Sequence, residues 1–169
     1  PTIDTNTDLS SKTLTTTGDL TIGGIIIDPN RPAFSVYTVG SFVLSSAQKI
    51  PFNTEFFDTT NSYNTDTYEY TIPITGNYFF YYSFNWVAGS SCVVRLDKNG
   101  IQQDRVILSV DVENNYYGFK SNDTIGARST MMLVCNENDT MRIWVESGSV
   151  KSFGFDGSAR NSFGGFLIG

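Results

Sequence analysis

The chain has many carboxylate side chains that could pair for acid–base chemistry, but it lacks the partners such chemistry usually needs. Its 169 residues include no histidine and no glycine-rich phosphate loop. A Ser-His-Asp triad, a Cys-His pair and zinc ligation by imidazole are therefore excluded. The sequence predicts a protein that is not an enzyme, with acidic residues that serve turns and solubility. Those in or beside predicted turns are Asp97, Asp104, Asp111, Glu113, Asp123, Glu137, Asp139 and Asp156.

Two polar segments carry aromatic side chains that could contact a ligand. Aromatic rings supply contact area at a low entropic cost, and rings flanked by Asn and Asp suit carbohydrate. An arginine beside the second group could meet an anionic ligand. The alternative is that these rings fill an interface between subunits. The residues concerned are Tyr116, Tyr117 and Phe119 in the first segment, and Phe153, Phe155 and Arg160 in the second.

Two cysteines, Cys92 and Cys135, are too few for a disulfide framework or a tetrahedral thiolate site. Both lie in segments that alternate between apolar and other residues, which predicts buried thiols on strands. A disulfide between them stays open at this point, because the sequence does not give their separation.

The elements that must position these residues are strands. No window of 11 or more residues from Ala33 onward shows helical periodicity, and short β-branched and aromatic runs alternate with turn signals. Residues 33–44 read as one strand, and residues 113–129 read as a long polar loop. Asn99-Gly100 between two alternating runs predicts a two-residue hairpin. This pattern indicates an all-β sandwich or jelly roll.

One predicted strand, residues 78–86, is aromatic on both faces. Tyr78, Phe80 and Tyr82 share one parity, and Phe79 and Tyr81 share the other. A strand that is apolar on both faces should be buried on both. One face can meet the sandwich core, and the other then requires a second protein surface. The sequence therefore predicts an obligate oligomer.

Residues 1–30 differ in composition from residues 31–169 and are predicted to form a neck or linker. Thr, Asp, Ser and Gly dominate, and Leu9, Leu14 and Leu20 are five to six residues apart. This spacing fits neither a helix nor a strand, but it suits the narrow seam of a multi-chain fibre. The composition resembles the Thr- and Gly-rich shafts of viral and phage fibres. A plain polar linker is the alternative.

The segment from Ala33 to Gly169 resembles the globular head of the C1q and tumour-necrosis-factor-like family. Six stretches match in order along the chain. They are residues 33–36, residues 50–53 with 61–63, residues 70–80 (YTIPITGNYFF), residues 94–100 (VRLDKNG), residues 139–145 (DTMRIWV) and residues 163–168 (FGGFLI). Asn138 stands where the family usually has glycine.

The resemblance implies an all-β, ten-stranded jelly-roll sandwich assembled as a homotrimer, with Phe79 and Tyr81 in the subunit interface. Family members often bind Ca²⁺ near the trimer apex. Asp111 and Asp123 flank the matching loop and are therefore candidate calcium ligands. No cofactor is required. The family's collagen-like Gly-x-y stalk is missing here, and the Thr-rich N-terminal segment replaces it.

These observations predict a non-enzymatic, trimeric recognition head at the tip of a fibre. The expected role is virion or phage attachment to a host-surface glycan or protein, at an extracellular or virion surface. The alternatives are an extracellular C1q-like adaptor or signalling protein of a cellular organism, and a purely structural trimerisation cap. The net charge of −6 argues against nucleic acid as a partner. No apolar run approaches the ~20 residues of a membrane span, so membrane insertion is not expected.

Overall fold

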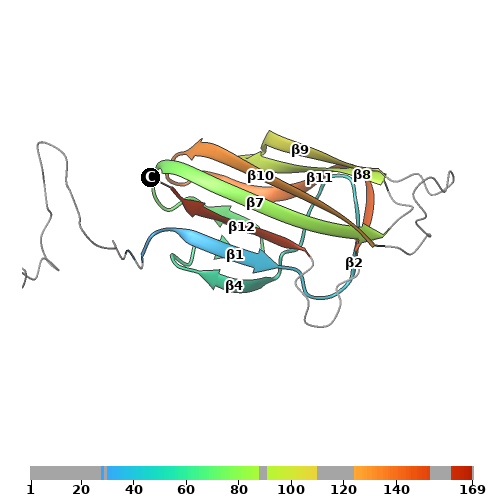
Figure 1. Cartoon of the computed structure of the whole chain (residues 1–169), viewed down its shortest axis with the longest axis horizontal. Helices are drawn as coiled ribbons and strands as arrows, with labels where there is room; N and C mark the ends of the chain where they lie inside the picture. Colours follow the sequence, from blue (N-terminus) through green and yellow to red (C-terminus); the bar gives the residue numbers. More distant parts are fainter. Residues whose placement is uncertain (1–27, 29, 88–90, 110–123, 153–160, 169) are drawn as a thin grey trace, which may run out of the picture.

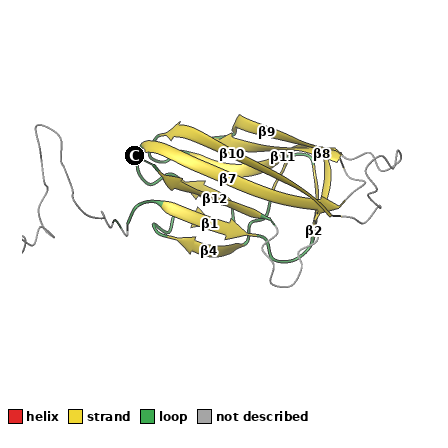
Figure 2. Cartoon of the chain, viewed as in Figure 1, coloured by secondary structure: helices red, strands yellow, loops and turns green. Residues whose placement is uncertain are grey.

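The computed structural model describes residue 28 and residues 30–87, 91–109, 124–152 and 161–168. Throughout this part of the chain the regular secondary structure is β, with no helix (Figure 2). A helix long and apolar enough to cross a membrane is therefore absent from it. Two antiparallel sheets pack face to face, and the core lies between them (Figure 1).

The first sheet has five strands. All of its pairings are antiparallel, and the first and last strands of the described chain lie side by side within it. Its order is β10 (Thr124–Cys135), β7 (Gly76–Val87), β12 (Ser162–Leu167), β1 (Ala33–Tyr37) and β4 (Thr54–Asp58).

The second sheet also has a continuous path of five strands, and two short strands pair with one edge of β11. The path is β5 (Tyr63–Asn64), β6 (Glu69–Thr71), β11 (Thr140–Ser152), β8 (Ser91–Lys98) and β9 (Ile101–Ser109). The two short strands are β2 (Phe42–Ser45) and β3 (Gln48–Lys49). The two continuous paths contain the ten strands of a jelly roll, so the predicted fold class is confirmed for the described residues.

The core combines aromatic side chains, most of them from the first sheet, with aliphatic side chains of the second sheet. Phe34 stacks on Tyr70 with ring centroids 3.9 Å apart, and it meets Phe163 edge to face at 5.0 Å. From β7, Tyr78, Phe80 and Tyr82 are buried in the same core. The predicted inward face of this strand is confirmed at these positions. The other fully buried large side chains include Phe52, Ile50, Ile72, Leu96 and Met141.

The predicted hairpin between β8 and β9 is confirmed. Asn99 and Gly100 have φ values of 52° and 80°, so both central residues are in the left-handed region that this two-residue turn requires. The Asn99 side chain also donates to Asp139 Oδ1 at 2.6 Å and accepts from the Thr140 N–H at 2.8 Å. The turn is thereby bonded to the start of β11.

Two predicted boundaries are wrong. Residues 33–44 do not form one strand, because the chain leaves β1 and crosses to the second sheet as β2, bending at Gly40 with a φ of 92°. The predicted loop 113–129 ends too late, because β10 already begins at Thr124, which pairs with Val87. β7 is 12 residues long, and its backbone groups need a partner strand of equal length.

The two ends of the sandwich differ. We call the end where β1 begins and β12 finishes the base; there the Leu167 N–H donates to Pro32 O at 2.8 Å (Figure 1). At the opposite end, which we call the far end, β7 finishes at Val87 and β10 begins at Thr124. The described strand ends that flank residues 88–90 and 110–123 therefore lie together, away from the base.

The predicted burial of Cys135 is confirmed. Its side chain is fully buried and is a free thiol, so the disulfide with Cys92 does not form. Burial raises the pKa of the Cys135 thiol to about 11. At pH 8 only about one thiol in a thousand is then ionised. We expect a Cys92→Ser variant to resist Ellman's reagent while folded and to react fully after denaturation. Rapid stoichiometric labelling of the folded variant would contradict this.

Candidate functional site

The predicted ligand and calcium residues lie outside the residues that the structure describes. The ligand group is Tyr116, Tyr117, Phe119, Phe153, Phe155 and Arg160, and the calcium pair is Asp111 and Asp123. Their roles stay predictions. In the described ranges no group of three or more Asp, Glu, Cys or His side chains could hold a metal ion.

The predicted interface residue Phe79 lies on the outer face of the first sheet, within an apolar surface. In one row across the sheet, β7 Phe79 pairs with Met132 of β10 on one side and Phe166 of β12 on the other. The rings of Phe79 and Phe166 have centroids 5.3 Å apart. Exposure of the surrounding side chains is high: 70% for Met132, 68% for Val134, 51% for Phe57 and 44% for Phe166. We call Phe57, Phe79, Met132, Val134 and Phe166 the outer-face patch.

The second predicted interface residue, Tyr81, lies flat on the same face. Its hydroxyl donates to Ser35 Oγ at 2.9 Å, and its ring passes over Gly164 of β12. A Cβ at Gly164 would collide with the Tyr81 hydroxyl and would lie 2.7 Å from Phe34 O. Glycine at this position therefore allows the Tyr81 side chain to cross β12 and reach from β7 to β1.

The sequence analysis missed Met132, Val134, Phe166 and Phe57. A signal for the first two was present, because residues 131–134 read Met-Met-Leu-Val and are apolar at both parities, like residues 78–82. Soluble monomers rarely expose a contiguous apolar surface of this kind, and such surfaces mark protein–protein contacts. The patch is therefore the candidate assembly surface.

The outer face of the second sheet has the opposite character, because a ladder of ion pairs covers it. Lys49 Nζ lies 3.0 Å from Glu69 Oε1, which Arg142 Nη1 also approaches at 3.1 Å. Asp97, with no exposed surface, lies 2.7 Å from Arg95 Nε and 3.5 Å from Arg142 Nε. Partial burial raises the pKa of Glu69, but the hydrogen bonds and charges of Lys49 and Arg142 together bring it below its usual value. The charged groups of this ladder are therefore ion-paired within the chain.

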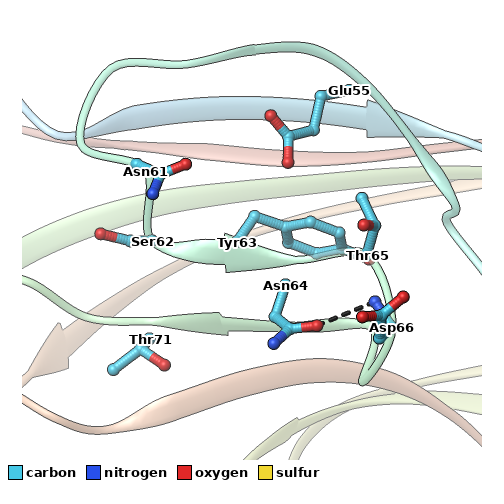
Figure 3. A pocket seen from close by; sticks show the side chains of 8 residues that line it. All are labelled: Glu55, Asn61, Ser62, Tyr63, Asn64, Thr65, Asp66 and Thr71. Atoms are coloured by element: carbon cyan, nitrogen blue, oxygen red, sulfur yellow. Dashed lines mark hydrogen bonds between the residues drawn. The ribbon is translucent and has the colours of Figure 1, made fainter.

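Two surface hollows flank the hairpin between β5 and β6. One, of about 630 Å³, is polar (Figure 3). Its shape is set by Asn64, whose Oδ1 accepts the Asp66 N–H at 2.8 Å and the Thr67 N–H at 2.9 Å. The other, of about 620 Å³, lies on the side of β11 and includes two aromatic residues. The first is lined by Glu55, Asn61, Ser62, Tyr63, Asn64, Thr65, Asp66 and Thr71.

Fold and surface together define a jelly-roll head domain with an exposed apolar sheet face. The chain belongs to the C1q domain family, whose model matches residues 33–168. This confirms the resemblance that the sequence motifs indicated. No curated protein sequence matches the chain.

Solved structures support the same fold. The globular domain of zebrafish complement 1qA protein is similar with a TM-score of 0.59 and 18% identity, covering 82% of this chain and 98% of that one. Eiger TNF from S. frugiperda has a TM-score of 0.59 and 15% identity, with coverage of 82% and 94%. Murine APRIL has a TM-score of 0.56 and 11% identity, with coverage of 82% and 99%. C1q and tumour-necrosis-factor structures thus share this architecture.

Proposed function

We propose that the chain is the recognition head of a homotrimer assembled through the outer-face patch. The observation that carries this is the contrast between the two outer sheet faces. The first sheet leaves Met132, Val134 and Phe166 exposed, whereas the second satisfies its charges internally. Burying a large apolar side chain contributes about 1.5–3 kcal/mol. Three copies packed through this face would cover it.

The role we propose is binding, without catalysis. C1q and TNF-like domains are recognition modules that generally are not enzymes, and the chain has no histidine to serve as a general base. A trimer presents three copies of one binding surface, so weak single contacts add up to useful avidity. The partner we propose is a cell-surface glycan or protein outside the cell.

The setting we propose is the tip of a virion or phage fibre. The Thr- and Gly-rich residues 1–30, which have no Gly-x-y repeat, support this setting. The family match equally supports a second candidate, a C1q-like adaptor of a cellular organism. Shaft repeats encoded upstream of Pro1 would favour the fibre, and a collagen repeat or secretion signal there would favour the adaptor. Failure of the trimer to bind glycans, proteins or cells would leave a structural trimerisation cap.

The mass of the native particle tests the assembly. We expect light scattering or sedimentation to give a value near three times the chain mass of 18.7 kDa, because the outer-face patch must be covered. The mass should stay constant on dilution to low micromolar concentration. A monomer of 18.7 kDa would overturn the proposal, since the patch would then be exposed to water without aggregation.

A further inference from the structure

The second hollow is a groove between two tight turns over the edge of β11. Its floor holds Lys49 of β3 and Trp144 of β11, which are paired residues and so lie on the same face. One wall is the turn between β2 and β3, and the other is the turn between β5 and β6. The full lining is Leu44, Ala47, Gln48, Lys49, Pro51, Asp66, Thr67, Tyr68 and Trp144.

Both walls contain a residue in an unusual backbone conformation. Five described non-glycine residues have positive φ, and three of them are asparagines, which tolerate that region. The other two are Ala47 at 64° and Tyr68 at 59°, and both line this groove. A bulky aromatic residue is a clear outlier there, and such conformations cluster at sites that clamp a ligand. Glycine would adopt the Tyr68 conformation without strain, but it would remove the ring from the groove.

The groove is also held in shape before any ligand arrives. Ala47 N–H donates to Val145 O at 2.9 Å, and Tyr68 N–H donates to Asn64 O at 2.8 Å. Lys49 Nζ on the floor donates to Thr67 O at 3.0 Å, which joins the floor to the turn between β5 and β6. A preformed site avoids the ordering free energy that a mobile site must supply on binding.

The indole of Trp144 is fixed by the ion-pair ladder. The Arg142 guanidinium carbon lies 4.5 Å from the centre of the Trp144 ring. Glu69 and Asp97 hold that guanidinium at 3.1 and 3.5 Å. The paired charges of the second sheet therefore position an aromatic side chain at the groove.

The chemistry of the lining selects a class of ligand. The rings of Tyr68 and Trp144 offer apolar faces and a polar edge, and Gln48, Thr67 and backbone groups can exchange hydrogen bonds. The one lysine has its charge matched by Glu69 at 3.0 Å, and Asp66 places an exposed carboxylate at the rim. Aromatic faces beside neutral hydrogen-bonding groups fit a pyranose ring, and the acidic rim disfavours an anionic sugar.

We propose that this groove binds a neutral saccharide, with the sugar ring packed against Tyr68 and Trp144. The inference rests on the proposed recognition function and deepens it, because it names a ligand class and a site that differ from the predicted loop residues. The groove lies on the sheet opposite to the outer-face patch. Trimer assembly through that patch leaves all three grooves open to solvent.

The test uses the full chain on an array of neutral oligosaccharides, ending in galactose, glucose or N-acetylglucosamine, with sialylated forms of the same glycans beside them. We expect wild-type protein to bind neutral glycans. Trp144→Ala and Tyr68→Ala should each weaken binding at least about tenfold, while Tyr68→Phe should retain it. A Trp86→Phe background leaves Trp144 as the sole indole, and its fluorescence should change on titration with the same glycan.

Glycine substitutions separate binding from folding. Tyr68→Gly should abolish binding and keep the melting temperature within about 2 °C, because relief of the left-handed φ offsets the greater freedom of glycine in the unfolded chain. Ala47→Gly, on the opposite wall, gives the same relief and should keep both binding and folding. A large fall in the melting temperature of Tyr68→Gly would show that the ring serves packing, and it would overturn the argument from strain.

The outcomes separate this inference from the function on which it rests. If glycan binding survives in Trp144→Ala and Tyr68→Ala but is lost in a Tyr116→Ala, Tyr117→Ala variant, the groove is wrong and recognition through residues 116 and 117 stands. Binding only to sialylated forms, or only to a protein receptor, also overturns the groove alone. Absence of binding to glycans, proteins and cells overturns both.

Discussion

Replacing Phe79 with aspartate should convert the proposed trimer into monomers. Phe79 lies at the centre of the row formed with Met132 and Phe166, so each copy would carry an uncompensated carboxylate into the interface. Such a charge costs on the order of 3 kcal/mol or more, and three copies contribute. Every 1.4 kcal/mol is about tenfold in affinity, so association should be lost at micromolar concentration. Analytical ultracentrifugation measures the change directly.

Ile101→Asp is the matched control for this prediction. Ile101 begins β9 on the second sheet and is 68% exposed, so the same added charge falls on the other sheet. We expect that variant to remain trimeric. Both variants should keep the β circular-dichroism spectrum. A Phe79→Asp trimer of unchanged stability would show that the first sheet is not the assembly surface.

Replacing Gly165 with valine should remove a large part of the stability of the head. A Cβ at Gly165 would lie 2.6 Å from Phe80 Cδ1 and 2.8 Å from Phe79 O, which is closer than packed atoms allow. The backbone oxygen cannot move without disturbing the pairing of β12 with β7. Overpacking of this kind costs about 3 kcal/mol. The melting temperature should fall by about 10 °C.

Gly40→Ala separates backbone strain from steric collision. Gly40 has a φ of 92° and no atom within 4 Å of an added Cβ. Alanine there meets only the unfavourable dihedral angle, which costs about 1 kcal/mol. Urea unfolding of both variants gives the two free energies. A loss at Gly165 no greater than that at Gly40 would mean that the β7–β12 contact adjusts easily.

The fold class could be predicted because its strands and turns have local sequence signals. These are the alternation of residue types along a strand and the turn residues between strands. The alternation in residues 78–82 separates the two faces of β7, and the family resemblance assigns Tyr78, Phe80 and Tyr82 to the core. The Asn99-Gly100 pair predicts its hairpin. The late boundary of the predicted 113–129 loop has a different cause. The segment from Thr124 is polar enough to read as loop, yet the length of β7 requires it as a partner strand.

The groove could not be predicted in the same way. Ala47, Tyr68 and Trp144 come from three segments far apart in the sequence, and only the pairing of β3 and β6 with β11 brings them together. The positive φ of Tyr68 could not be predicted either, because finding a tyrosine in a turn does not indicate its backbone conformation. By contrast, the apolar residues at both parities of 131–134 would have extended the predicted assembly surface to Met132 and Val134.

The position of β1 has a mechanical consequence. β1 lies inside the first sheet, with five residue pairs to β12 and four to β4. The preceding residues enter it at the base, so tension carried through them pulls along the axis of the strand. Its hydrogen bonds run perpendicular to that axis and therefore share the load in shear, instead of peeling open one by one. A head that is held through these residues would resist a pulling force at β1, the first strand to carry that force.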